Sequence, residues 1–289
     1  MRRREQIDWR VENGPLIGMR LWLSSSPWRL GAAWAAIAGA LASGRLTWQG
    51  ADWIRLCLLI FLTDPLWGGL WAVWVERQRG AEEVQDLHQG AAPAMPYLRP
   101  GSPAARLLGW MERDQALVTA WRLGLPALLT TILTSLILGQ QALFATGMAL
   151  ILCFIGWTTR QLNGLPNLWA QALVTIGLPW VLGHVAYAPL GAVAGGLALA
   201  FVLWQRAALG IQSGEKYAWW LLGLAQAAAA IVLVIARHPL GAASLTLMAL
   251  PVWWMRMGQA MEPSTALARS QMWWWLALLL SGWALGSSL

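Results

Sequence analysis

The stretch TDPLWGGLWAVWVERQRGAEEVQD, Thr63 to Asp86, contains the change in composition that decides the fold. Its first half is almost entirely apolar, and its second half is rich in charged and polar side chains. This change is typical of a helix that leaves the hydrocarbon core of a membrane and continues into a water-exposed loop. We therefore predict a membrane span that ends near Val75 and a cytoplasmic loop over residues 76–114.

The composition of the whole chain supports a membrane protein. The sequence has 289 residues, of which 58% are hydrophobic and 11% are charged, whereas a soluble domain has about 25% charged residues. Apolar runs recur at about the 20 residues that a spanning helix needs, and a backbone in lipid must satisfy its own hydrogen bonds. We predict an all-α, polytopic membrane helix bundle with spans at 28–46, 53–75, 115–138, 141–157, 168–187, 189–207, 218–236, 239–256 and 268–287.

The basic residues predict the orientation. The formal net charge is +7, and most arginines fall in alternate loops, starting with a basic leader at residues 1–27. The positive-inside rule therefore places the N-terminus in the cytoplasm and the C-terminus outside. Only Arg45, Arg55 and Arg237 fall on the outer side. Topology explains the charge without a nucleic-acid partner, and residues 28–289 are expected to form a single transmembrane domain.

Several small and polar residues are expected to have structural roles within the bundle. Asp64 would be costly if it were ionised in lipid, so it should face the bundle interior, where it pairs or takes a proton. Asn163 and Asn167 are expected to cap or link helices. Close approach of neighbouring helices is expected at small residues, here Gly39, Gly44, Gly191, Gly195 and Gly196.

Five motifs in order carry a resemblance to a known family. They are AGALASG (Ala38 to Gly44), DPLWGG (Asp64 to Gly69), LNGLPN (Leu162 to Asn167), GLPWVLGH (Gly177 to His184) and LGIQSGEKYAWW (Leu209 to Trp220). In these motifs the chain resembles chlorophyll and bacteriochlorophyll synthases of the UbiA superfamily of intramembrane prenyltransferases. The resemblance implies nine helices and a bacterial inner membrane.

The resemblance also implies two acidic motifs, which hold two Mg²⁺ ions that stabilise a departing diphosphate. The first reads Asn-Asp-x-x-Asp-x-x-x-Asp in the family and corresponds here to WVERQRGAE, where Trp74 and Val75 replace the opening pair. Gln78 replaces the next carboxylate, Glu82 keeps the last, and Arg79 matches a basic residue of the family.

At the second motif, the acidic positions fall on about Leu199, Trp204 and Arg206. Of the basic residues that hold the diphosphate in the family, only Arg160 has a counterpart here. The family's Tyr-Ser pair before them is replaced in this chain by Gly156 and Trp157. Most of the metal ligands that the family uses are therefore absent from this sequence.

The favoured hypothesis is a non-catalytic relative of bacteriochlorophyll synthase that acts as a pigment- or lipid-binding scaffold, or as a subunit of a photosynthetic membrane complex. Its expected ligand is bacteriochlorophyll, a carotenoid or a quinone, and its partners are membrane lipids and other membrane subunits. His184 is a candidate ligand to the magnesium of a chlorin. The other ligand-binding candidates are Asp64, Trp74, Arg79, Arg160, Trp204 and Arg206.

Two alternatives stay open. One is an active prenyltransferase that transfers a prenyl group from its diphosphate to a tetrapyrrole or quinone ring. It would use Mg²⁺ at a displaced site formed by Glu76, Glu82, Glu83 and Asp86. The other is a transporter or channel, which the small number of charges within the spans disfavours.

Overall fold

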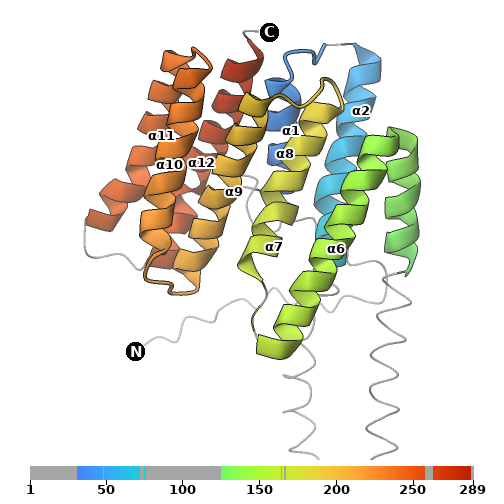
Figure 1. Cartoon of the computed structure of the whole chain (residues 1–289), viewed down its shortest axis with the longest axis horizontal. Coiled ribbons are helices and arrows are strands. Elements are labelled where there is room, and N and C mark those ends of the chain that lie inside the picture. Colours follow the sequence, from blue (N-terminus) through green and yellow to red (C-terminus); the bar gives the residue numbers. More distant parts are fainter. Residues whose placement is uncertain are drawn as a thin grey trace, which may run out of the picture.

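The chain folds into helices throughout the part that the structure, a computed structural model, describes. Described are residues 31–47, 49–71, 75, 125–163, 165, 167–257 and 263–287, and within them there is no strand. Figure 1 shows the bundle. Its elements are α1 (Ala32–Ala42), α2 (Gly50–Phe61), η1 (Leu62–Leu66), α3 (Trp67–Trp71), the helix Leu125–Leu138, α6 (Gln140–Asn163), α7 (Leu168–Ala172), η3 (Leu173–Gly177), α8 (Leu178–Val185), α9 (Ala192–Gln212), α10 (Ala218–Ile235), α11 (Pro239–Met257) and α12 (Pro263–Gly286). The prediction of an all-α bundle is confirmed.

Among the described residues, five helical stretches are long and apolar enough to cross a membrane. They are Gly50–Trp71, Gln140–Arg160, Leu168–Val185, Ala192–Gln212 and Ala218–Ile235. Shorter apolar helices occur at Ala32–Ala42, Leu125–Leu138 and Pro239–Trp254, and α12 lies where the last span is predicted. The chain is therefore an integral membrane protein, and nine crossings stay a prediction.

Two of the spanning helices widen locally into a π-helical turn beside a proline. η1 contains Pro65 and separates α2 from α3, while η3 directly precedes the turn of α8 that contains Pro179. Proline has no N–H to donate and its ring clashes with the carbonyl four residues earlier. A wider turn accommodates the ring while the helix continues through the apolar core.

Helix α1 packs backbone to backbone between α8 and α12. A Cβ atom added at any of four glycines would clash with a carbonyl oxygen across these contacts: Gly39 with Trp180, Gly183 with Ala36, Gly282 with Ala38 and Gly286 with Leu41. Because lipid gives no hydrophobic drive for helices to associate, such close van der Waals packing is a main source of their affinity. These contacts form what we call the glycine seam.

The structure corrects the glycine prediction. Gly39 makes the predicted close approach, but a Cβ at Gly191 would meet nothing within 4 Å, and one at Gly195 would meet only the Leu190 side chain, at 4.0 Å. The prediction was wrong for Gly191 and Gly195, because composition marks small residues without telling which side of a helix meets its neighbour.

Helix α6 is the least enclosed of the five candidate spans. The most apolar stretch of α6 is 28% buried inside the protein, against 61% for Leu168–Val185. Its exposed side chains include Phe144, Ile151 and Phe154. An apolar outer surface is the expected surface for a helix in contact with acyl chains.

Candidate functional site

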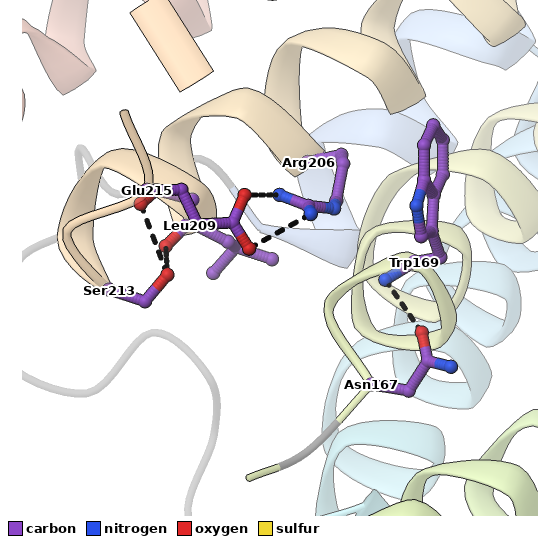
Figure 2. A network of polar contacts seen from close by, with 7 residues as sticks. Asn167, Trp169, Arg206, Leu209, Ser213 and Glu215 are labelled. Atoms are coloured by element: carbon purple, nitrogen blue, oxygen red, sulfur yellow. Dashed lines mark hydrogen bonds and ion pairs between the residues drawn. The ribbon is translucent and has the colours of Figure 1, made fainter. Parts of the chain in front are cut away.

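The predicted residue Arg206 forms an ion pair at the end of the bundle where α9 ends and α10 begins. Its Nη1 and Nη2 donate to Oε2 and Oε1 of Glu215 at 2.8 and 3.0 Å. The Arg206 side chain is 14% exposed and that of Glu215 is 42% exposed. Figure 2 shows this paired geometry. It satisfies both carboxylate oxygens at once, which is the strong form of an arginine–carboxylate contact.

The surroundings of Arg206 fit the ion pair closely. A Cβ at Gly210 would lie 2.7 Å from both Arg206 Nη1 and Glu215 Oε2, so glycine leaves the space that the pair occupies. On the other side, the guanidinium carbon lies 5.6 Å from the centre of the Trp169 ring, within cation–π range. Asn167 fixes the start of α7, since its side chain accepts from the amides of Trp169 and Ala170 at 3.0 and 3.2 Å. The capping role of Asn167 is thereby confirmed.

Trp204 lies in the protein core. It is 1% exposed and stacks on Phe201 with ring centres 5.7 Å apart. The ring centre of Phe201 also lies 5.7 Å from that of Trp180. Trp204 packs edge to face on Trp274 of α12, with ring centres 5.6 Å apart. These four rings form an aromatic column across α8, α9 and α12. Trp204 and Arg206 are two residues apart on α9, so they point to different sides of it.

The aromatic column contains unpaired donors. The indole Nε1 atoms of Trp180, Trp204 and Trp274 are buried and have no hydrogen-bond partner among the described residues. Buried N–H groups are normally paired, and each exception calls for an explanation such as a bound group. The column therefore contains three buried donors, and its rings are at most 3% exposed.

Arg160 engages the backbone rather than a side chain. Its Nη1 donates to the carbonyl oxygen of Val75, beyond the end of α3. Nearby, Gly156 leaves room for an indole: a Cβ there would lie 2.7 Å from the ring of Trp71 and 3.3 Å from Val75. Trp71 is fully buried. Where the family resemblance implies a tyrosine, this chain has glycine with an indole ring packed against it.

Asp64 faces the interior, as predicted. It is 1% exposed, and it forms a hydrogen bond with the backbone of Ala33. Ala33 lies in the first turn of α1, where backbone amides have no partner within the helix. The second carboxylate oxygen of Asp64, Oδ2, has no partner among the described residues. Asp64 thus stabilises the buried start of α1 and keeps one free acceptor.

His184 lies at the opposite end of the bundle, at the end of α8. It is 3% exposed, and its Nε2 lies 3.3 Å from the carbonyl oxygen of Pro189. Ligation of a chlorin through Nε2 would require this contact to break. The ligand role of His184 stays a prediction.

The structure does not bring all the predicted residues to one place. Arg206 and Trp204 lie on different sides of α9, and His184 lies at the other end of the bundle from Arg206. Within the described residues, no group of three or more His, Cys, Asp or Glu side chains could hold a metal ion. The remaining candidates lie outside the described residues: Trp74, Glu76, Arg79, Glu82, Glu83 and Asp86.

Two residues of the Arg206 site were not found by sequence reasoning. Trp169 and Gly210 contact the ion pair; Gly210 lies one helical turn after Arg206 on α9, whereas no sequence spacing links Trp169 to Arg206. The motif LGIQSGE, which contains both Gly210 and Glu215, was a usable signal for the glycine. Trp169 comes from a different helix, so only the fold reveals it.

Comparison with known proteins gives one similarity. The chain is 29% identical over 162 residues to the bacteriochlorophyll synthase 34 kDa chain of Chloroflexus aurantiacus. The match covers 54% of this chain and 46% of that relative, so the chain spans about half of the relative's length. No protein-family model matches the sequence, and no solved structure matches it. The chain is therefore similar, over about half of its length, to a bacteriochlorophyll synthase chain.

Proposed function

We propose that this protein is a non-catalytic member of the UbiA superfamily that serves as a pigment- or lipid-binding scaffold in the bacterial inner membrane, with its N-terminus in the cytoplasm. The likeness to a bacteriochlorophyll synthase chain supports, as part of this proposal, a place as a subunit of a photosynthetic membrane complex. The observation that carries the proposal is the ion pair between Arg206 and Glu215. It occupies the part of α9 that the family resemblance assigns to the second metal.

The charges of the α9–α10 region do not suit a diphosphate-releasing site. Departure of a diphosphate needs cations held by carboxylates, because the developing negative charge must be stabilised. Glu215 is the only acidic residue in the sequence between Asp114 and Glu262, and Arg206 satisfies both of its oxygens. Trp204 and Arg206 supply an indole and a cation where the resemblance implies carboxylates. This region is therefore poor in ligands for a second Mg²⁺.

The ligand-binding part of the proposal rests on the aromatic column. Trp180, Trp204 and Trp274 place flat apolar faces and three N–H donors without a described partner inside the core, so a ligand would bind where the rings now pack against each other. A bacteriochlorophyll or a quinone carries carbonyl oxygens on a flat ring and an apolar tail, so it matches both features. A carotenoid would match only the apolar faces.

The test is to purify the full chain gently and analyse what it carries. An absorption spectrum and a lipid extract identify bound pigment, and mass spectrometry identifies protein partners. We expect a stoichiometric tetrapyrrole, carotenoid or quinone, or a photosynthetic subunit. We also expect no Mg²⁺-dependent transfer of a prenyl group from its diphosphate to a bacteriochlorophyllide or quinone acceptor. Such transfer by the purified protein would overturn the non-catalytic proposal.

A second candidate function is an active prenyltransferase, which the likeness to a bacteriochlorophyll synthase chain of Chloroflexus aurantiacus favours. Its metal site would use Glu76, Glu82, Glu83 and Asp86. The test replaces all four with Gln and measures turnover with Mg²⁺, with Glu112→Gln as the control. Loss of turnover in the fourfold variant alone supports the displaced site, and unchanged turnover excludes these carboxylates as metal ligands.

A further inference from the structure

A cavity of about 140 Å³ lies near the end of the bundle where α2 begins and α8 ends. This is the end opposite to the Arg206–Glu215 pair, as the course of α9 in Figure 1 shows. The cavity is lined by Arg55, Leu59, Leu138, Gln141, Ala142, Leu182 and Ala186. An engineered protein cavity of ~150 Å³ holds a benzene ring. The space therefore accommodates a short segment of an apolar chain.

The walls of the cavity divide into an apolar floor and a polar mouth. Leu59, Ala142 and Leu182 are at most 1% exposed and form the floor. Arg55 and Gln141 are exposed and lie at the mouth. A ligand with a polar group joined to an apolar tail matches this division.

Arg55 is held in position at the mouth. Its Nη1 donates to the carbonyl oxygen of Ala186 at 3.0 Å, and its guanidinium carbon lies 5.7 Å from the centre of the Tyr187 ring. The Tyr187 hydroxyl in turn donates to the backbone oxygen of Asp52 at 3.0 Å. These contacts fix the guanidinium without neutralising it. An arginine has five N–H donors, so the side chain can also bind an anion.

The nearest carboxylate on α2 forms its hydrogen bonds with Thr47 and not with Arg55, although its charge still acts on the guanidinium. Asp52, one turn before Arg55, accepts from the backbone amide of Thr47 at 3.0 Å and from its hydroxyl at 2.5 Å. Arg55 follows Gly50, the start of the span, by five residues, which is about 7.5 Å along a helix. Its charged end can reach the membrane interface from this depth. The guanidinium is therefore within reach of lipid phosphates.

We propose that this cavity binds an anionic phospholipid. The phosphate lies against Arg55 and Gln141, and the first part of an acyl chain lies against Leu59, Leu138 and Leu182. Arginine suits this task because its planar fork pairs with two phosphate oxygens at once. The site is separate from the Arg206 region and does not depend on the proposed function.

The test is native mass spectrometry of the full chain released from detergent micelles. The added probes are phosphatidylglycerol, phosphatidylcholine and inorganic phosphate, each at the same concentration. We expect one phosphatidylglycerol to be retained in preference to phosphatidylcholine. Arg55→Gln should weaken retention about tenfold, which is the effect of one lost charge-assisted hydrogen bond.

Two further variants separate binding from folding. Arg45→Gln removes an exposed arginine from the α1–α2 connection without touching the cavity, and it should retain the lipid as the unmodified chain does. Gln141→Trp closes the mouth from an exposed position and leaves Arg55 intact, so it should also lose the lipid. Equal retention by Arg55→Gln, an equal loss in Arg45→Gln, or displacement of the lipid by inorganic phosphate would each overturn the proposal.

Discussion

The glycine seam and the α9–α10 turn hold neighbouring helices together in different ways. In the seam, α1 meets α8 and α12 through backbone atoms at four glycines, which have no Cβ to keep the helices apart. At the turn, a charged pair and a tryptophan ring make the contact. The seam is therefore specified by the absence of side chains, whereas the turn is specified by their chemistry. The turn and the adjacent aromatic column are accordingly where a ligand role can be sought.

The largest effect is expected when a side chain is forced into the seam. Gly183→Leu should prevent folding, because the added side-chain atoms would overlap the carbonyl of Ala36, and the helix backbone cannot move aside. Overpacking of this kind lowers the free energy of unfolding by about 3 kcal/mol or more. The measurement is the share of protein that elutes as a single species in detergent.

The matched control for the seam is Gly191→Leu, where an added Cβ meets nothing within 4 Å. It should elute like the unmodified chain. If Gly183→Leu also behaved normally, or if both variants failed equally, close backbone packing would not be what holds the seam.

The next largest effect is expected in the aromatic column. Trp204→Ala should lower the free energy of unfolding by about 3–5 kcal/mol, since it removes a fully buried ring. If the ring also fills space that a ligand tail could take, bound lipid per protein should rise. Thermal midpoints and lipid extracts measure the two quantities, with the 82% exposed Trp220→Ala as control. A midpoint unchanged from that of the control would contradict the buried position of Trp204.

A smaller effect is expected at the turn. Arg206→Glu should lower the free energy of unfolding by about 1–2 kcal/mol, because it replaces an attraction with a repulsion and removes the contact with Trp169. The double variant Arg206→Glu with Glu215→Arg should recover part of this loss. Lys216→Glu, an exposed charge reversal beside Glu215, is the control. Absence of recovery in the double variant would show that the charge pair contributes little.

The smallest effect is expected at the start of α7. Asn167→Ala should cost about 1 kcal/mol, because it removes the side chain that accepts from two backbone amides. Asn163→Ala, an exposed change near the end of α6, should cost less. Differential thermal unfolding of the two variants checks the order, and an equal effect would argue against the capping role.

Much of the fold could be predicted from sequence, for identifiable reasons. Long apolar runs predict helices because lipid offers no partner for a free backbone group, and each predicted span overlaps a helix among the described residues. Asp64 was expected inside because a charge in lipid is costly, and it is 1% exposed. The cap at Asn167 followed from residue type.

The site was harder to predict, because it depends on helix rotation and on contacts between distant segments. Sequence placed Trp204 and Arg206 together as ligand candidates, but α9 turns one into the core and the other toward Glu215 and Trp169. The seam glycines Gly282 and Gly286 gave no periodic signal that separated them from Gly191 and Gly195.

The sequence by itself determined that this chain is a helical membrane protein and that carboxylates are scarce after residue 114, because hydropathy and charge are properties of residue type. Only the tertiary structure decided which glycines meet a neighbouring backbone, that Arg206 pairs with Glu215 beside Trp169, and that Arg55 and Gln141 open onto a shared cavity. These features depend on how each helix is turned against its neighbours, and that orientation arises from packing over the whole bundle rather than from any local run of residues.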